Sequence, residues 1–351
     1  MTRRDVEALA VGGAILGGGG GGWAETGRQE GLLALEIGDV ELWGADEAPE
    51  DWTVITCAAL GAPSQRGATK PRHFIRAVQL LREVGVEFDG LIAAENGGHN
   101  SFGGWIPAAA LGLPVVDTPG DGRAHPTAMM GSMGLHRTEY SSVKAGCTEG
   151  SEVVAWGSLQ STSNVIRAQA RDMKALVAMA RDPVKVAYTK EHGAPGGIGQ
   201  AIELGETFLG VKADDPKSRV DSVVEFLDGE FVCKGRIAEK SLAAEGGFDV
   251  GYFKIEAGDE SFDLSFVNEY MTLEVGDRRL ATFPDLVTTF DEEGLPATSA
   301  QLEEGDTVYL ISVDKSKILV GDGNRYTENI ELIERVLKRS LIEHIRGYMK
   351  N

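Results

Sequence analysis

Hydrophobic residues in the first part of the chain recur at helical spacing, and short apolar runs separate these stretches. The helical patterns cover about 3–16, 24–36, 71–84, 161–180 and 197–209. The apolar runs, which are typical of strands, lie at Val54–Leu60, Leu91–Ala94, Val115–Val116 and Val184–Tyr188. Alternation of this kind favours a mostly parallel sheet covered by helices. We therefore predict an α/β N-terminal domain over residues 1–213.

The pattern changes near residue 214, where apolar and polar residues begin to alternate in short runs. Asp-Gly, Gly-Gly and Gly-Asp pairs separate the runs at Ser222–Phe226, Gly251–Ile255, Phe262–Phe266 and Thr307–Ser312. Alternation with tight turns is typical of antiparallel strands. This predicts an all-β C-terminal domain over 214–322. In the remaining segment, 323–351, helical spacing predicts a helix at 327–347 that could pack back on the first domain.

Charge and cysteine content narrow the class of partner. The 54 acidic residues outnumber the 34 basic ones and give a net charge of −20, which argues against nucleic acid or an anionic membrane as partner. No apolar run approaches the roughly 20 residues of a membrane span. Cys57, Cys147 and Cys233 are odd in number and far apart, which fits a reducing compartment. We therefore expect a cytoplasmic protein.

The strongest candidate for chemistry follows the apolar run at Leu91–Ala94. Glu95 and Asn100 are separated by Asn96, Gly97, Gly98 and His99, and open α/β sheets place their sites where a strand ends in such a turn. Glu95 can serve in acid–base catalysis, and Asn100 can donate to and accept from an amide-like substrate. The alternative is structural, with Asn100 as a helix N-cap and Glu95 as a turn carboxylate.

A second cluster occupies Leu113–Pro126. Asp117 stands at another strand end and is a second candidate for the catalytic base. Arg123 follows two glycines and can bind a substrate carboxylate through two hydrogen bonds. The structural alternative is an ion pair between Asp117 and Arg123 that holds the loop.

Gly17–Gly22 is a run of six glycines after a predicted helix, without the preceding strand that a dinucleotide site requires. It is either a flexible connector or an anion site built from backbone N–H groups at a helix start. In the second case its guest is a carboxylate or a developing oxyanion. The substrate-binding set that we predict from these loops is Gly18, Gly19, Gly20, Ser64, Gly97, Gly98, His99 and Arg123.

No cofactor is required by these motifs, and a divalent metal such as zinc is the alternative. His99, His125 and Asp117 are the candidate ligands, with Glu95 and His136 as further donors. The chain has no H-x-x-x-H or C-x-x-C spacing of the kind that marks zinc sites.

Motifs along most of the chain resemble those of the S-methyl thiohydantoin desulfurase family, which is linked to hydantoin utilisation. The resemblance spans about residues 5–312. In the first domain it rests on Ala14–Gly22, Leu60–Pro63, Glu95–Ser101 and Gly112–Asp117, with Gly120, Gly122, Arg123 and Pro126. In the second domain it rests on Gly246–Phe248, Phe266–Glu269 and Phe283–Leu286.

The resemblance implies an α/β domain joined to an all-β domain, and a hydrolase that acts on a small cyclic substrate. The implied reaction releases methanethiol from an S-methyl thiohydantoin. Two alternatives remain open: a metal-dependent cyclic amidase, and a non-catalytic subunit of a hydantoinase complex. We accordingly expect either a homo-oligomer or a hydantoinase-type partner subunit.

Overall fold

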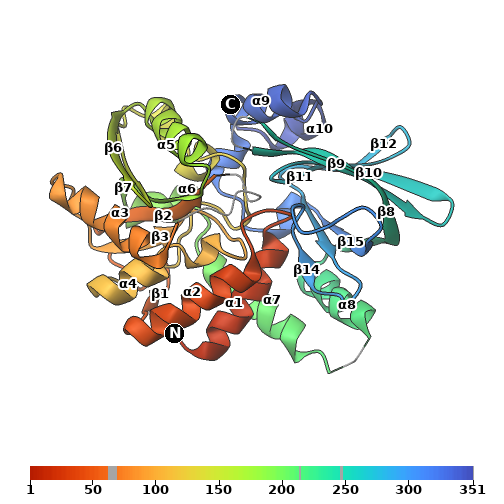
Figure 1. The fold of residues 1–351 in the computed structure, drawn as a ribbon, viewed down its shortest axis with the longest axis horizontal. Coiled ribbons are helices and arrows are strands. Elements are labelled where there is room, and N and C mark those ends of the chain that lie inside the picture. The colour runs from red at the N-terminus through yellow and green to blue at the C-terminus, as the bar shows by residue number, and fades with distance from the viewer. Residues whose placement is uncertain (62–68, 213–214, 246–247, 351) are drawn as a thin grey trace.

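The computed structural model describes residues 1–61, 69–212, 215–245 and 248–350. Figure 1 shows a half covered by helices, which carries the N-terminus, beside a half dominated by long strands. Each half is built on one sheet, of seven strands in the first and eight in the second. The two sheets confirm the predicted pairing of an α/β part with a β-rich part.

The seven-stranded sheet is mixed, so the prediction of a mostly parallel sheet is wrong in part. Its order is β1-β4-β3-β2-β7-β5-β6, and only the pairs from β1 to β2 are parallel. The antiparallel side consists of β7 and the hairpin of β5 and β6, which turns at Gly150, where φ is +76°. The strands are Leu42–Trp43 (β1), Thr53–Leu60 (β2), Gly90–Ala93 (β3), Val115–Val116 (β4), Ser142–Thr148 (β5), Ser151–Gly157 (β6) and Val177–Lys185 (β7).

Helices on this half match the predicted positions with two corrections, and α4 was not predicted. Thr2 and Asp5 form the capping box that begins α1. The helix predicted at 161–180 ends at Met173, because Lys174 adopts a left-handed φ of 48° before β7 begins. The run predicted as a strand at Val184–Tyr188 is mostly helix. The helices are Arg3–Leu16 (α1), Ala24–Ile37 (α2), Pro71–Glu83 (α3), Trp105–Leu111 (α4), Leu159–Met173 (α5), Val186–His192 (α6) and Gly197–Gly210 (α7).

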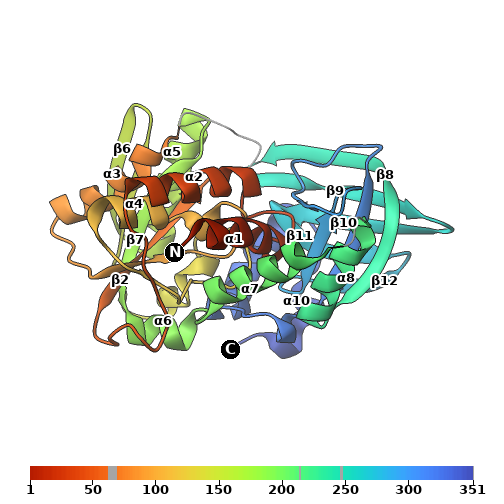
Figure 2. The ribbon, with the colours of Figure 1, turned by 90° about the horizontal axis from the view of Figure 1, so that it is seen from below.

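Helices α1 and α7 pack closely and lead from the first half toward the second (Figure 2). A Cβ on Gly12 would collide with the backbone of Ala201, and a Cβ on Gly205 would collide with the backbone of Ala8. Glycine therefore lets the two backbones touch. This contact places the glycine-rich segment after α1 between the two halves.

The eight-stranded sheet is antiparallel throughout, with order β12-β11-β10-β9-β8-β15-β13-β14. The predicted strand at Ser222–Phe226 is wrong, since it lies in helix α8, Pro216–Leu227, which Asp215 caps. Its buried residues Val220, Val223 and Leu227 follow helical spacing. The strands are Glu230–Glu245 (β8), Phe248–Ala257 (β9), Glu260–Val267 (β10), Glu269–Val275 (β11), Arg278–Thr282 (β12), Leu286–Phe290 (β13), Pro296–Ala297 (β14) and Thr307–Val313 (β15).

The segment predicted as one helix at 327–347 is broken in two. Helix α9, Thr327–Leu337, ends where Lys338 takes a φ of 57°, and α10 covers only Ile342–Ile345. Glu334 stabilises the break by accepting hydrogen bonds from two backbone N–H groups of the next turn. The apolar face packs on strand residues of the second half and on Met130 of the first.

Candidate functional site

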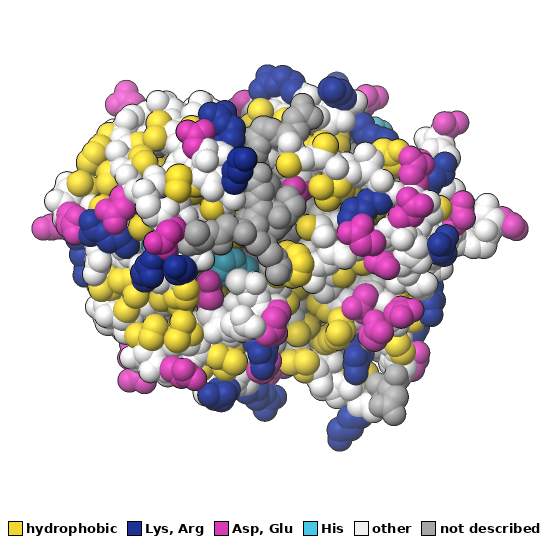
Figure 3. Space-filling model, viewed as in Figure 1, with side chains coloured by type: hydrophobic (Ala, Val, Ile, Leu, Met, Phe, Trp, Pro, Cys, Tyr) yellow, Lys and Arg dark blue, Asp and Glu magenta, His cyan; other side chains and the backbone are white. Residues whose placement is uncertain are grey.

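A cavity of about 250 Å³ lies between the two halves. Its walls come from the glycine-rich loop, the ends of β2 and β3, the segment 125–128, β7 and the turn between β10 and β11, with side chains from helices α2, α3 and α5. Figure 3 shows charged side chains of both signs spread over the face seen in Figure 1, with a histidine side chain near its middle. The sequence places these lining segments far apart, so only the fold brings them together.

Glu95 and Asn100, the two main candidates, both line this cavity and touch each other. The side-chain amide of Asn100 donates to Glu95 Oε1 over 2.6 Å, and its Oδ1 accepts from the backbone N–H of Ala59 at the end of β2 over 3.2 Å. Asn100 therefore fixes the Glu95 carboxylate against the neighbouring strand end. Among the described residues Oε1 accepts this one hydrogen bond, so it can still accept another from a ligand.

His125 pairs with the other oxygen of the same carboxylate. Its Nδ1 lies 2.9 Å from Glu95 Oε2, and its backbone N–H donates to that oxygen over 3.2 Å. Burial by itself would lower the pKa of His125, but the charge of the Glu95 carboxylate and its contact with the ring outweigh burial and raise it. The contact with Glu95 therefore favours the protonated form of the imidazole.

Glu269, at the start of β11, brings a second carboxyl to the cavity from the other half of the molecule. Its Oε1 accepts from the backbone N–H of Gly21 over 3.2 Å, and its Oε2 has no hydrogen-bond partner among the described residues. Burial, followed by the negative charge of Glu95, raises the pKa of Glu269 to about 8. At neutral pH this carboxyl is mostly protonated and can donate a proton.

Sequence reasoning did not select Glu269, although it ends one of the motifs behind the family resemblance. The preceding residue is a further signal that only the structure reveals. Asn268 has a φ of 57°, and its Oδ1 accepts from the backbone N–H of Asp249 over 2.9 Å. A left-handed residue other than glycine is uncommon and concentrates at functional sites.

The glycine-rich loop contacts the second half of the molecule through Gly18 and Gly19, which do not line the cavity. Their carbonyl groups accept from the backbone N–H groups of Tyr270 and Ser299, each over 2.8 Å. Gly20 leaves room for the Glu269 carboxylate, with which a Cβ would collide. The carboxylate that this loop binds through Gly21 is thus one of the protein's own side chains.

Gly97 and Gly98 also serve close packing rather than the cavity wall. A Cβ on Gly97 would lie 2.5 Å from the Cα of Gly21, and one on Gly98 would lie 2.6 Å from the nitrogen of Ala24. His99 does line the cavity, and its Nε2 lies 2.9 Å from Glu30 Oε2. Ser64, the remaining predicted contact, lies outside the described residues.

Asp117 and Arg123 do not reach the cavity and do not pair with each other. Asp117 caps helix α7, since its two oxygens accept from the N–H groups of Ile198 and Gly199 over 2.7 and 2.9 Å. Arg123 Nη1 donates to the carbonyls of Pro284 and Asp285 over 3.1 and 2.5 Å. The loop 117–123 thus supports the site, while 125–128 faces the cavity.

The candidate metal ligands are also engaged separately. His99 contacts Glu30, His125 contacts Glu95, and Asp117 binds backbone N–H groups. His136, the further donor, contacts Glu328 on α9. Within the described ranges, no three His, Cys, Asp or Glu side chains gather closely enough to hold a metal ion.

The helices of the described residues contain no candidate for a membrane span, since none combines the required length with an apolar sequence.

Comparison with known proteins agrees with this two-part architecture. A family model described as "S-Me-THD-like, N-terminal domain" matches residues 4–156, and one described as "S-Me-THD-like, C-terminal domain" matches residues 158–322. A crystal structure of a protein from Chromobacterium violaceum shares the fold with a TM-score of 0.69 and 20% identity, covering 96% of each chain. No curated protein matches the sequence.

Proposed function

Because the chain belongs to the S-Me-THD-like family, we propose that it is a hydrolase of hydantoin-like rings that releases methanethiol from an S-methyl thiohydantoin. The observation that carries this proposal is the convergence of two carboxyl groups, Glu95 and Glu269, on one cavity from opposite halves of the molecule. Two carboxyls in different environments suit the two proton transfers of a hydrolysis.

The size of the cavity supports a small cyclic substrate. Pockets for drug-sized ligands measure roughly 300–1,000 Å³. A cavity of about 250 Å³ lies just below that range and suits a five-membered ring with a short substituent. Its wall combines apolar side chains such as Leu60, Phe74 and Met179 with the polar groups described above, a mixture that is typical of small-molecule sites.

In the first step, Glu95 acts as general base and Glu269 as general acid. Glu95 takes a proton from water while the water oxygen bonds to the ring carbon that carries the methylthio group. The electron pair of the C=N bond moves to nitrogen, which takes the proton of the Glu269 carboxyl. His125 Nδ1 lies 2.9 Å from Glu95 Oε2 and holds that carboxylate in position for this role.

In the second step, the new hydroxyl proton returns to Glu269 and the C=O bond forms as the C–S bond breaks. The departing methanethiolate takes the proton held by Glu95. The products are the hydantoin and methanethiol, and both carboxyl groups regain their starting protonation. Asn100 keeps Glu95 in place throughout through its 2.6 Å hydrogen bond.

The test is thiol release from a panel of S-methyl thiohydantoins, monitored with a thiol-reactive dye. Glu95→Gln and Glu269→Gln should each lower kcat by about 10²–10⁴-fold, the usual contribution of a positioned acid or base. Glu303→Gln, at an exposed glutamate paired with Lys240, is the matched control. Near wild-type turnover in both site variants would overturn the mechanism. No turnover by the wild-type protein alone would instead favour a non-catalytic subunit.

A further inference from the structure

A second pair of a histidine and a carboxylate lies on the cavity wall, apart from the His125–Glu95 pair. His99 Nε2 lies 2.9 Å from Glu30 Oε2, and both residues line the cavity. The two side chains are 7% and 14% exposed, so the pair is largely withdrawn from bulk water. The reaction described above gives neither residue a role.

The position of the His99 ring is fixed by its neighbours. The backbone N–H of His99 donates to the carbonyl of Gly21 over 3.0 Å. Phe74 on α3 meets the imidazole edge to face, with 6.0 Å between the ring centroids. A Cβ on Gly22, whose φ is +80°, would lie 2.6 Å from the Cβ of His99. Glycine at this position therefore lets the glycine-rich loop close on the histidine.

The other ring nitrogen of His99, Nδ1, is accessible to a ligand. It lies on the edge of the ring nearer to Gly22, since a Cβ on that glycine would lie 3.5 Å from it. Gly22 also lines the cavity. Among the described residues Nδ1 has no hydrogen-bond partner, and it is not fully buried. A ligand in the cavity can therefore reach this atom.

Glu30 determines which kind of group Nδ1 can bind. An imidazole is ordinarily uncharged at slightly alkaline pH and then carries one proton. An ionised carboxylate only accepts hydrogen bonds, so contact with Glu30 places this proton on Nε2 and leaves a lone pair on Nδ1. In this tautomer Nδ1 binds an N–H group of a ligand and not a carbonyl group.

The other acidic side chains of the site have different tasks in the proposed reaction. Glu95 is held by Asn100 and His125 and acts as the base toward water. Burial raises the pKa of Glu269 to about 8, so this carboxyl donates a proton to the ring nitrogen of the C=N bond. The second ring nitrogen next to the methylthio carbon carries a hydrogen. His99 Nδ1 is an acceptor that the reaction leaves free for this N–H.

We propose that Nδ1 of His99 accepts a hydrogen bond from the ring N–H at position 3 of a hydantoin-type ligand, between the ring carbonyl and the carbon that carries the methylthio group. The proposal rests on the proposed function for the identity of the ring. His99 is then a specificity-determining residue, because a ligand without this N–H leaves a largely buried acceptor without a partner. Glu30 is a positioning residue, since it acts through His99.

The test compares two isomers, 1-methylhydantoin and 3-methylhydantoin, by calorimetric titration of the wild-type protein at pH 7.5. Both carry one added methyl group, but only the first keeps the N–H at position 3. We expect the first to bind about tenfold more tightly or better, which is the usual cost of a buried acceptor without its partner. Equal affinities of the wild-type protein for the two isomers would overturn the proposal.

Three variants assign the preference to the pair. His99→Phe keeps a flat ring without a nitrogen acceptor, so the two isomers should bind equally. Glu30→Gln should reduce the ratio of affinities severalfold, because an amide can donate to Nε2 as well as accept from it and no longer fixes the proton there. Glu25→Gln, on the same helix at a side chain that is 62% exposed, is the matched control and should leave the ratio unchanged. A folded His99→Phe protein with the wild-type ratio would contradict the assignment.

The two proposals can fail independently. Binding of the methylated hydantoins needs no turnover, whereas thiol release from an S-methyl thiohydantoin that keeps its N–H tests the reaction. Thiol release together with equal affinities for the isomers would support the hydrolase and remove the role of His99. A preference for the N–H without any thiol release would support the role of His99 in binding a cyclic imide and contradict the hydrolase.

Discussion

The protonation of Glu269 should make the stability of the protein depend on pH, and Glu269→Gln should remove that dependence. Burial and the nearby charge of Glu95 raise the pKa of Glu269 from its ordinary value of 4.5 to about 8. The folded protein thus holds a proton that the unfolded chain releases. Glutamine has the shape of the protonated carboxyl but does not titrate, so it isolates this one group.

The sign of the effect follows from linkage between proton binding and folding. The stabilising contribution of the protonated carboxyl is complete below pH 4.5 and is lost as the pH rises through about 8. Each pKa unit corresponds to about 1.4 kcal/mol, so the full loss has a ceiling of about 5 kcal/mol. We expect a loss of a few kcal/mol between pH 5 and pH 9.

Urea denaturation at pH values from 5 to 9 measures this loss. The free energy of unfolding of Glu269→Gln should match that of the wild-type protein near pH 5 and exceed it by roughly 2–4 kcal/mol near pH 9. Glu303→Gln, at an exposed glutamate, controls for the removal of one charge. Parallel stability curves for the wild-type protein and Glu269→Gln would refute the protonated state of Glu269. The proposed acid step would then fail as well.

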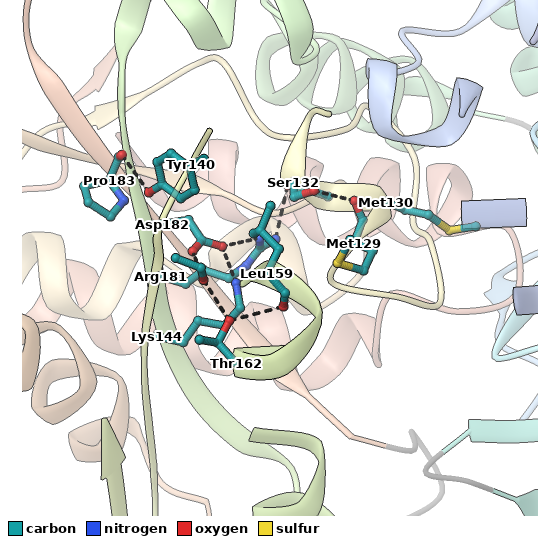
Figure 4. A network of polar contacts seen from close by, with 12 residues as sticks. Met129, Met130, Ser132, Tyr140, Lys144, Leu159, Thr162, Arg181, Asp182 and Pro183 are labelled. Carbon is teal, nitrogen blue, oxygen red and sulfur yellow. Dashed lines mark hydrogen bonds and ion pairs between the residues drawn. The ribbon is translucent and has the colours of Figure 1, made fainter. Parts of the chain in front are cut away.

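Three further predictions concern groups around the site. Gly20→Ala should lower kcat for thiol release by more than tenfold, because its Cβ would collide with the Glu269 carboxyl group. Gly210→Ala, where a Cβ meets open space, is the control and should leave kcat unchanged. Asp182→Asn should lower the free energy of unfolding by about 3–5 kcal/mol, because it leaves the buried cations of Lys144 and Arg181 without a carboxylate (Figure 4). Urea denaturation measures this loss. Arg123→Lys should lower the melting temperature without slowing thiol release, because Arg123 binds the carbonyls of Pro284 and Asp285 and does not line the cavity.

Local patterns predicted the elements whose formation depends on nearby residues. The capping box and apolar face of α1, and the alternating runs of β9, β10 and β15, are of this kind. The hairpin β5–β6 was missed because β5 is buried throughout and shows no alternation. In α8 the apolar pairs resemble a short strand, but the side chain of Asp215 caps the first turn and favours a helix.

Side-chain direction was the harder part of the site to predict. Glu95, His99 and Asn100, which follow the end of a strand, all line the cavity. Asp117 stands at an equivalent strand end, but the first N–H groups of α7 bind its carboxylate. That helix lies about 80 residues further along the chain, as the separation of 81 between Asp117 and Ile198 shows. A sequence pattern without long-range contacts cannot distinguish these two environments.

The two halves depend on each other for the site, because each supplies one of its two carboxyl groups. Glu269 belongs to the second half, but Gly21 of the first half holds its carboxylate. Arg123 of the first half is fixed by carbonyls of the second, and Asp121 accepts from the N–H of Gly321 over 2.9 Å. A change that separates the halves would expose Glu269 to water, lower its pKa and remove the acid from the reach of Glu95. The protonated state of Glu269 that the proposed reaction needs therefore depends on the contact between the two halves.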